Sequence, residues 1–599
     1  MLCNSTRAAS LASLLVLLCP SVLSFAIQSQ RDALEVPWKL SRRGVVSSYN
    51  RRQYDTGACE NGPKSRSCWG QFDIDTDHDR EWPDTGNIVK YLFEVSNMTL
   101  APDGVEKRMT VVNGQYPGPT IEANWGDDIE ISVTNNLESN GTGIHWHGMR
   151  QLGSNEMDGT AGLTECPIPP GGSKVYRFKA TQFGTSWWHS HYSAQYSDGV
   201  LGPIVIHGPA TKDYDIDLGA LPITDWFYAP AFEVNAETLH ANRPPTADNM
   251  LVNGSMTSSA GGEYAVTHLT KGKAHLLRFV NTGINNWANV ALDGHPFTVV
   301  AADLVPIAPY TTNTLTIAVG QRYDVIINAN QTVGNYWLRI GPGGGGCDGP
   351  NANGANIRSI FRYEGAPDAN PNSTPSVPLP ASCDDEANIV PWIKSTVPQE
   401  TPKEMEVKFA NTVVSGTNLV QWLIDDSPLH MNYSRPTIQH IFDGNNTFER
   451  YENVYDLGTA DTWQYWVIQQ DPANLAAIPH PIHLHGHDFY VLDAKAGASW
   501  SGDTSSLKMD NPTRRDTATL PAAGYLVLAF KSDNPGMWLM HCHIPFHLSQ
   551  GFGVQFAERR SEIPSTIGGE DVVKQECRDW VAWREKYYPN GFAEGDFIL

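Results

Sequence analysis

Eleven of the 19 histidines in this 599-residue chain fall in four short motifs. A single buried histidine is most often held by a backbone carbonyl. Four clusters in one chain instead indicate metal binding, because histidine is the commonest metal ligand in proteins. The motifs are HWHG (His145, His147), WWHSH (His189, His191), HPIHLHGH (His480, His483, His485, His487) and HCHIPFH (His541, His543, His547).

The spacing within the last two motifs fits β-strands, in which residues i and i+2 point to one face and residue i+1 to the other. His541 and His543 can then reach one metal cluster while Cys542 faces another site. In HPIHLHGH, His483 and His485 share a face, and His480 has the opposite parity unless Pro481 rotates it. The pattern predicts two metal sites joined by a short stretch of backbone.

The cysteine count singles out the thiol of Cys542. If Cys3 and Cys19 leave with an N-terminal leader, seven cysteines remain, and in an oxidising compartment only six of them can pair. Cys542, His480 and His547 have the composition of a blue copper centre, which normally carries a weak axial ligand. Zinc also takes Cys and His, but the other histidines would then need further zinc ions with almost no Cys or carboxylate. Copper is favoured.

Short alternating runs such as residues 107–112, 202–208, 275–281 and 525–531 predict strands separated by Gly, Pro and Asn turns. Long helical periodicity is scarce, so an all-β chain of sandwiches or barrels is expected. The predicted organisation is a signal peptide (1–26), an N-terminal extension (27–84), domains at 85–208, 209–365 and 400–560, a linker (366–399) and a tail (561–599) with short helices near 572–588.

The N-terminus indicates export. An arginine precedes the apolar run Leu11–Leu18, and small residues suited to cleavage follow, as in a secretory signal peptide. No later stretch reaches the ~20 apolar residues that a membrane-spanning helix needs, so a soluble secreted protein without an anchor is expected. A formal net charge of -23 argues against a nucleic-acid partner. Seven glycosylation sequons fit a secretory route: Asn97, Asn140, Asn253, Asn330, Asn372, Asn432 and Asn445.

With these motifs, the chain from about Asp84 onward closely resembles the multicopper oxidases, and among them the laccases of filamentous ascomycetes. The resemblance implies three cupredoxin-like domains and four copper ions. It assigns His480, Cys542 and His547 to a type 1 copper, with His145 and His483 on a type 2 copper. It assigns His147, His189 and His543 to one type 3 copper and His191, His485 and His541 to the other. His487 is no ligand in this pattern and is expected to be a hydrogen-bonded structural residue.

The implied reaction is one-electron oxidation of a phenolic or other aromatic reductant, coupled to four-electron reduction of O₂ to water. The resemblance makes Asp158 the acid that supplies protons. The protein is expected to be a monomer. It likens the terminal residues 595–599 to a plug of the oxygen channel; a frayed terminus is an equal alternative. It also implies the disulfides Cys59–Cys68, Cys166–Cys577 and Cys347–Cys383, whereas sequence alone allows 15 pairings of six cysteines.

Two positions depart from the family pattern. Phe552 stands where the axial ligand is expected, and because Phe has no donor atom we predict an intermediate to high reduction potential. Asn285 aligns with the carboxylate that accepts the proton of a phenol, and an amide cannot act as a base near neutral pH. Simple phenols are therefore expected to be poorer substrates than larger polyphenols or pigment precursors.

Other functions stay open at this point. An oxidase of secondary metabolism, which couples or cyclises polyketide or pigment phenols, would share every motif. A ferroxidase needs carboxylates beside the type 1 site, and none is recognisable in the sequence. A copper protein without catalytic activity would be expected to have lost ligands, whereas all ten histidines and Cys542 are present.

Overall fold

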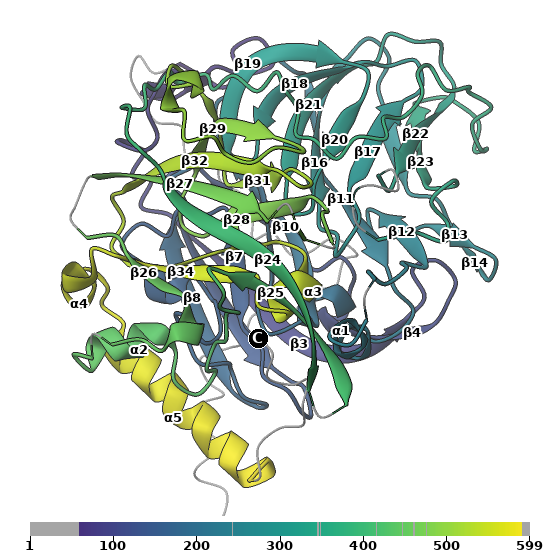
Figure 1. The fold of residues 1–599 in the computed structure, drawn as a ribbon. Helices are drawn as coiled ribbons and strands as arrows, with labels where there is room; N and C mark the ends of the chain where they lie inside the picture. The colour runs from purple at the N-terminus through teal and green to yellow at the C-terminus, as the bar shows by residue number, and fades with distance from the viewer. Residues whose placement is uncertain are drawn as a thin grey trace, which may run out of the picture. The chain divides into compact units, whose positions relative to one another are not determined.

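The computed structural model describes residues 59–589, apart from 242, 344–346, 348, 415, 446, 459–461, 472 and 475. The expected signal peptide (1–26), the expected extension as far as residue 58 and the terminal segment 595–599 lie outside the described residues. Within the described part, six sheets of four to six strands pack in pairs as three sandwiches (Figure 1). The predicted all-β class is confirmed.

The first sandwich consists of two four-stranded sheets whose buried faces share one apolar core. The strand orders are β4-β3-β6-β8 and β5-β10-β9-β7. Their bounds are β3 (Ile88–Leu100), β4 (Lys107–Val112), β5 (Ile121–Asn124), β6 (Asp128–Asn135), β7 (Ile144–His147), β8 (Ser173–Lys179), β9 (Gly184–Ser190) and β10 (Leu201–His207). Buried and more exposed residues alternate along β6 and β8. On β6 the buried positions are mostly apolar, whereas on β8 they include Lys174 and the apolar Val175 is exposed.

The second sandwich pairs a six-stranded sheet, β12-β11-β16-β21-β18-β19, with a five-stranded sheet, β15-β23-β22-β17-β20. The six strands are β11 (Ile216–Trp226), β12 (Asn249–Val252), β16 (Ala274–Asn281), β18 (Phe297–Ala302), β19 (Val305–Thr312) and β21 (Arg322–Asn328). The five strands are β15 (Val266–Leu269), β17 (Ala288–Leu292), β20 (Leu315–Ile317), β22 (Asn335–Gly341) and β23 (Arg358–Tyr363).

The third sandwich repeats this arrangement with sheets β25-β24-β27-β32-β29-β30 and β26-β34-β33-β28-β31. The first sheet has β24 (Lys403–Val414), β25 (Thr417–Ile424), β27 (Thr462–Gln470), β29 (Phe489–Lys495), β30 (Thr513–Arg515) and β32 (Tyr525–Ser532). The second has β26 (Val454–Asp456), β28 (His480–Leu484), β31 (Thr517–Leu520), β33 (Gly536–Cys542) and β34 (Gly553–Glu558). Each pair of sheets falls inside one predicted domain range; the boundaries themselves stay predictions.

Short elements lie outside the six large sheets. They are β1 (Cys68–Trp69), β2 (Phe72–Asp73), β13 (Thr257–Ser258), β14 (Gly261–Gly262), α1 (Ala231–Thr238), α2 (Thr437–Phe442), α3 (Pro545–Ser549) and α4 (Ile563–Thr566). The expected linker 366–399 has no helix or strand of its own, but side-chain hydrogen bonds fix it to the sandwiches. Asp385 accepts from Thr519, and Trp392 donates to Asp75.

The expectation of short helices near 572–588 is wrong in one respect, because a single helix, α5 (Glu570–Tyr587), runs through this stretch beside α2 (Figure 1). Its apolar residues Val573, Cys577 and Trp580 recur at three- and four-residue spacing and are buried. The disulfide to Cys166 attaches it to the first sandwich.

A buried ion pair reinforces this attachment. Lys174 on β8 lies 2.7 Å from Glu165 and 3.1 Å from Glu576 on α5. The other two disulfides, Cys59–Cys68 and Cys347–Cys383, are also the pairs that the resemblance implied, and Cys542 is buried and takes part in none of the three disulfides. Among the described helices, none is both long and apolar enough to cross a membrane.

Candidate metal centre

Strand pairing brings the four histidine motifs together two by two. In the first sandwich β7 runs antiparallel to β9, and His145 lies opposite His189. In the third sandwich β28 runs antiparallel to β33, and His483 lies opposite His541. Both registers put histidines from two motifs on one face of a sheet, so each sandwich presents a group of imidazoles.

Residues of opposite parity on these strands have other roles. Trp146 on β7 and Trp188 on β9 are fully buried in the core of the first sandwich. On β33, Cys542 faces a different site from His541, as the strand spacing predicted. The alternation of the strands therefore separates metal-ligating from core side chains.

The two groups of imidazoles interleave between the first and third sandwiches. The ring of His145 stacks on that of His485, and the ring of His147 on that of His483, each with centroids 3.8 Å apart. All eight histidines of this cluster are buried: His145, His147, His189, His191, His483, His485, His541 and His543.

The ring nitrogens of the cluster converge in small groups. The Nε2 atoms of His485 and His541 are 3.2 Å apart, and Nδ1 of His147 lies 3.1 Å from Nε2 of His543. Among the described residues, the groups whose ligand atoms lie within 4.8 Å of one another include His145–His147–His189, His145–His483–His485 and His191–His485–His541. The last trio is one of those that the sequence predicted for a type 3 copper.

Several nitrogens of the cluster lack a protein partner. Nδ1 of His145 donates to the carbonyl oxygen of Asp158 at 2.9 Å, and Nδ1 of His483 donates to that of Asp516 at 2.9 Å. The opposite atom, Nε2, is buried in both rings and has no hydrogen-bond partner among the described residues, and the same holds for Nε2 of His189. Buried polar atoms are rarely left unsatisfied, and a metal ion fits these bare nitrogens.

The electrostatics of the cluster suit metal binding. Burial and then neighbouring imidazoles lower the pKa of His483 well below its usual range, and the same causes act on His485. Burial lowers the pKa of His541 to about 3. Neutral imidazoles keep a lone pair for a metal ion, whereas protonated ones do not.

Asp158, a residue singled out in the sequence, lies at this cluster. Its Oδ2 atom accepts from Nδ1 of His485 and from the hydroxyl of Thr160, both at 2.8 Å. Its Oδ1 atom is 3.2 Å from Nδ1 of His145. The carboxylate thus contacts one histidine from each sandwich.

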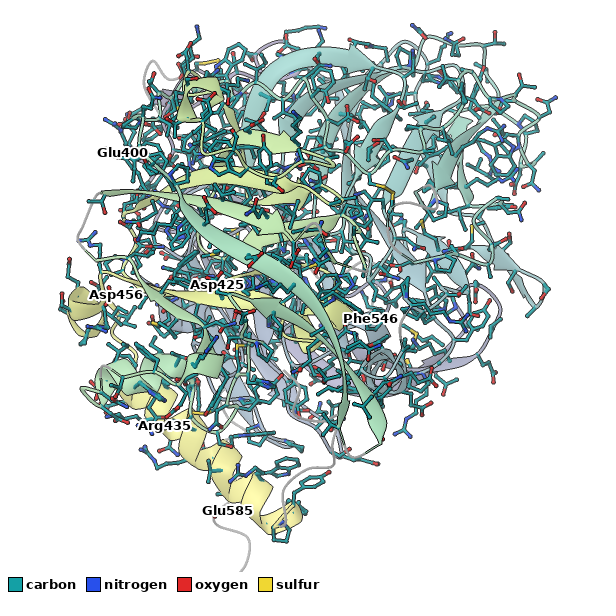
Figure 2. All side chains as sticks on the ribbon, in the orientation of Figure 1. Glu400, Asp425, Arg435, Asp456, Phe546 and Glu585 are labelled. Carbon is teal, nitrogen blue, oxygen red and sulfur yellow. A yellow bond between two sulfur atoms is a disulfide. The ribbon has the colours of Figure 1, made fainter. Side chains whose placement is uncertain are left out.

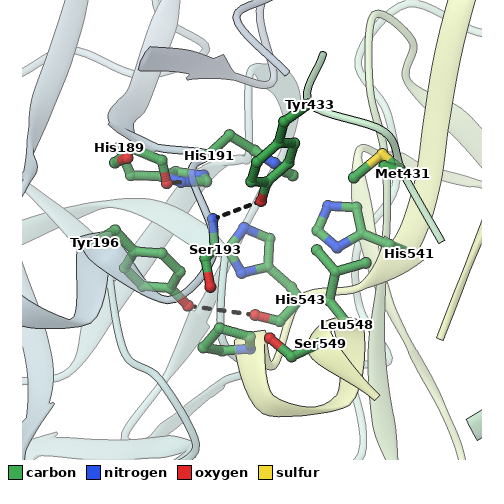
Figure 3. Close-up of a pocket in the computed structure, with 12 residues that line it drawn as sticks. His189, His191, Ser193, Tyr196, Met431, Tyr433, His541, His543, Leu548 and Ser549 are labelled. Atoms are coloured by element: carbon green, nitrogen blue, oxygen red, sulfur yellow. Dashed lines mark hydrogen bonds between the residues drawn. The ribbon is translucent and has the colours of Figure 1, made fainter. Parts of the chain in front are cut away.

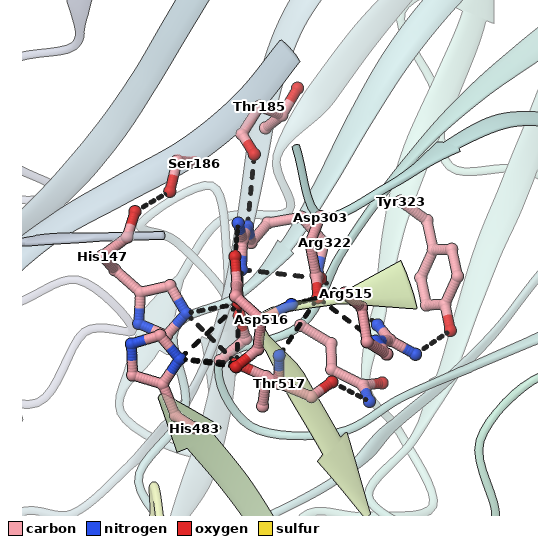
Figure 4. Close-up of polar contacts among 12 residues, drawn as sticks. His147, Thr185, Ser186, Asp303, Arg322, Tyr323, His483, Arg515, Asp516 and Thr517 are labelled. Carbon is pink, nitrogen blue, oxygen red and sulfur yellow. Dashed lines mark hydrogen bonds and ion pairs between the residues drawn. The ribbon is translucent and has the colours of Figure 1, made fainter. Parts of the chain in front are cut away.

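Asp516 is a second buried carboxylate that sequence reasoning missed (Figure 4). Its Oδ1 atom lies 3.3 Å from Nε2 of His147 and 3.6 Å from Nδ1 of His483. Arg322, at the start of β21, donates to both carboxylate oxygens at 2.7 and 2.5 Å. Burial raises the pKa of Asp516 to about 7, although Arg322 favours its charged form. The sequence around Asp516 has no metal-binding spacing that would predict its contacts with His147 and His483.

His480, Cys542 and His547 form a separate buried site. The Sγ atom of Cys542 lies 3.7 Å from Nδ1 of His480 and 3.5 Å from Nδ1 of His547, and the two nitrogens are 3.2 Å apart. One thiolate and two imidazoles facing a common point suit copper. His487 is in neither site: its Nε2 atom lies 3.0 Å from Glu558.

Aromatic rings enclose this second site. The ring of Phe552 lies 4.8 Å from that of His480, and its carbonyl accepts from the backbone N–H of Cys542. The ring of Trp422 on β25, a residue outside the four histidine motifs, lies 4.5 Å from the His480 ring and 5.1 Å from the His547 ring. The surroundings are therefore apolar and add no donor atom from these two side chains.

A cavity reaches the His547 side of this site. Its walls are mainly apolar and include Trp422, Ile478 and Phe546, the last on α3 beside β25 (Figure 2). Asn285 also lines the cavity and is buried, yet neither its amide oxygen nor its amide nitrogen has a hydrogen-bond partner within the described part of the chain.

The loop that carries Asn285 is held by a buried carboxylate. Asp225, on β11, accepts hydrogen bonds from the backbone N–H groups of Ile284 at 2.5 Å, Asn285 at 2.9 Å and Asn286 at 3.2 Å. Burial raises the pKa of Asp225 to about 6, and these hydrogen bonds oppose the rise. A buried side chain of the second sandwich therefore holds this loop in place.

A different cavity borders the histidine cluster (Figure 3). His189, His191, His541 and His543 line it, and its volume of about 20 Å³ is enough for a molecule the size of water. Tyr433 accepts a hydrogen bond from the backbone N–H of Ser193 at its edge.

The geometry agrees with comparisons to known proteins. Multicopper oxidase family models match residues 94–211, 219–366 and 424–562. A laccase of Neurospora crassa is 43% identical over 550 residues, which cover 88% of this chain and 87% of that protein. Laccase-3 of Botryotinia fuckeliana is 48% identical over 455 residues, which cover 74% of this chain and 100% of that protein.

A solved structure has the same fold. The crystal structure of the laccase from Botrytis aclada matches with a TM-score of 0.84 and 41% identity, covering 90% of this chain and 100% of that one. These similarities extend over all three sandwiches and both candidate sites. The chain therefore belongs to the multicopper oxidase family, as its histidine and cysteine motifs predicted.

Proposed function

We propose that this laccase-type multicopper oxidase couples one-electron oxidation of phenolic and other aromatic reductants to four-electron reduction of O₂ to water. The observation that carries the proposal is the position of His547. Its Nδ1 atom faces Cys542, and its side chain also lines the cavity that contains Asn285. A reductant in this cavity would contact an edge of the type 1 site.

Four copper ions per chain are proposed, with the ligands that the sequence suggested. The type 1 ligands are His480, Cys542 and His547, and the type 2 ligands are His145 and His483. The two type 3 trios are His147, His189, His543 and His191, His485, His541. Convergence of ligand atoms within 4.8 Å supports the type 1 group and the trio His191, His485 and His541. The Nε2 atoms of His145 and His483, which have no hydrogen-bond partner among the described residues, support the type 2 pair. Bound copper would supply the electron-transfer and oxygen-reducing chemistry.

The protein's own residues would link the two sites. Cys542 is bonded through the backbone to His541 and His543, so the thiolate and both imidazoles belong to one continuous stretch of chain. Asp158 would hold His485 in the tautomer that exposes Nε2 and would deliver protons to the cluster. The cavity of Figure 3 would admit O₂ to the cluster from the side of His191 and His541.

The cavity at His547 favours an organic reductant over iron. None of the described residues that line it is Asp or Glu. Fe²⁺ prefers oxygen ligands of this kind, whereas an aromatic ring gains from the apolar walls that Trp422 and Phe546 provide. This difference makes a ferroxidase the weaker alternative.

Export, glycosylation and a monomeric state complete the proposal. Three disulfides fit an oxidising compartment. None of the sequon asparagines is buried, so each is accessible to a glycan: Asn97, Asn140, Asn253, Asn330, Asn372, Asn432 and Asn445.

The test is O₂ uptake by the purified copper-loaded protein. The reductants would be simple phenols, an aromatic amine, ascorbate, Fe²⁺ and polycyclic phenolic metabolites. We expect uptake with the phenolic compounds and a blue absorption band that disappears on removal of copper or on Cys542→Ser. Uptake only with Fe²⁺ or ascorbate would contradict the proposed substrate class, and a colourless protein with full copper would contradict the type 1 assignment.

A further inference from the structure

Among its described lining residues, the cavity beside His547 carries a positively charged side chain and no negatively charged one. Arg243 lies on its lining, in the segment that follows α1. Its side chain is exposed and makes no hydrogen bond or ion pair with any residue that the structure describes. The described lining contains no Asp or Glu to compensate it. The mouth of the cavity therefore carries an unpaired positive charge.

The buried end of the cavity is polar but uncharged. The amide of Asn285 is 1% exposed, and both of its polar atoms are without a partner in the described residues. A buried amide of this kind is costly unless a ligand or water satisfies it. It can accept a hydrogen bond from a phenolic O–H and donate one to the same oxygen, whereas an ionised carboxylate only accepts.

We propose that this cavity selects aromatic reductants that bear a carboxylate. The phenolic oxygen would meet Asn285 near His547, the ring would pack on the apolar walls, and the carboxylate would face Arg243. The inference rests on the proposed laccase-type function and narrows its substrate class. An acidic residue at position 285 would oppose such an anion, and the amide found there does not.

The net negative charge of the protein opposes the binding of an anionic reductant. Salt screens this long-range effect, which distinguishes it from a direct contact with Arg243. A net charge of -23 repels anions at long range. Salt screens that repulsion beyond about 8 Å at physiological ionic strength. A direct contact with one exposed guanidinium changes binding by about two- to fivefold, in keeping with other solvent-exposed ion pairs.

The test compares 4-hydroxy-3,5-dimethoxybenzoate with its methyl ester, at about pH 6, where the carboxylate is ionised. The kcat/KM ratio for acid over ester is measured in the wild type and in variants. Dividing the acid-to-ester ratio of each variant by that of the wild type removes the effect of the different reduction potentials of the two compounds. The variants are Arg243→Gln, Arg243→Lys, Arg243→Glu and the control Arg177→Gln, on the exposed face of β8.

We expect Arg243→Gln to lower the acid-to-ester ratio by about two- to fivefold, mainly through the KM of the acid. Arg243→Lys should retain most of the preference, Arg243→Glu should lower the ratio further, and Arg177→Gln should leave it unchanged. An unchanged ratio in Arg243→Gln and Arg243→Glu would overturn the inference while leaving the proposed function intact. Absence of O₂ uptake with both compounds would instead refute the proposed function, and the inference with it.

Discussion

The Oδ2 atom of Asp158 lies 2.8 Å from Nδ1 of His485, although the two residues are 327 positions apart in the chain. The hydrogen bond spans the contact between the first and third sandwiches and leaves Nε2 of His485 directed at His541. A carboxylate that accepts from one imidazole nitrogen fixes the tautomer and makes the other nitrogen a better ligand.

Asp158→Asn should therefore lower kcat for O₂ reduction by about 10- to 100-fold, the usual effect of losing a carboxylate that orients a metal-bound histidine. Turnover and copper content would be measured together, because loss of copper would also lower activity. Asp456→Asn, at an exposed ion pair with Arg560, is the control and should be neutral. Full copper content with unchanged kcat in Asp158→Asn would contradict the role of this carboxylate.

Arg322 gives a prediction about stability. It is fully buried and donates two hydrogen bonds to Asp516, so Arg322→Ala leaves a buried carboxylate without its cation. Breaking a buried pair in this way costs about 3–5 kcal/mol. A lower melting temperature and reduced copper content at the cluster are expected.

Arg322→Lys keeps the charge but not the two-pronged geometry, so we expect an intermediate melting temperature. Arg362→Ala is the matched control, because its partner Asp368 is almost fully exposed and such pairs contribute at most about 1 kcal/mol. Equal melting temperatures for Arg322→Ala and Arg362→Ala would show that the buried pair does not support the cluster.

Phe552 gives a prediction about redox potential. Its ring lies 4.8 Å from that of His480 and provides no donor atom to the type 1 site. Phe552→Met would introduce a thioether, and an added axial ligand should lower the reduction potential of the blue copper. Redox titration of the blue band measures this. The control is Phe556→Met, because Phe556 packs on Trp466 and Phe530; an unchanged potential in Phe552→Met would sink the prediction.

Strand parity accounts for how much of the site could be read from the sequence. His483 and His485 reach the cluster and His480 does not, because successive side chains of a strand alternate. The same rule separates Cys542 from His541 and His543. These are local relations, set by one or two residues of spacing, and Pro481 does not disturb them.

The residues that were missed depend on contacts between distant segments. Asp516 comes to the cluster because β31 pairs with β28 and places Thr517 opposite His483, and Arg322 from another sandwich pairs with its carboxylate. Trp422 lies beside His480 because the two sheets of the third sandwich, one with β25 and the other with β28, pack face to face. The apolar face of helix α5 packs in a core shared by segments of the first and third domains, and a disulfide ties the helix to Cys166. No periodicity within a single motif carries this information.

Asn285 gives a prediction about pH dependence of catalysis. Asn285→Asp would place a titratable carboxylate beside the phenolic oxygen, where the amide can accept a hydrogen bond but cannot act as a base. We expect faster oxidation of neutral phenols at pH values where the new carboxylate is ionised, and slower oxidation of aromatic carboxylates. The pH–rate profiles of both substrates measure this. If neither profile changes, this position does not contact the phenolic oxygen.

Asp225 makes stability depend on pH in a definite direction. Burial raises its pKa from an ordinary value of 3.8 to about 6, so the folded protein binds the proton more tightly than the unfolded chain does. The stabilisation from protonation is complete below about pH 4 and is lost as the pH rises through about 6. Two facing tyrosines, Tyr116 and Tyr196, stay neutral throughout, because burial raises the pKa of both.

Asp225→Asn should therefore flatten the dependence of melting temperature on pH between about 4 and 6, by an amount that corresponds to at most about 3 kcal/mol. The variant keeps an oxygen that can accept from Ile284 or Asn285, so the loop should still form. Asp248→Asn, which removes another carboxylate that accepts from a backbone N–H, is the control. A slope in Asp225→Asn equal to that of the wild type would show that Asp225 is ionised throughout this range and that other groups set the pH dependence.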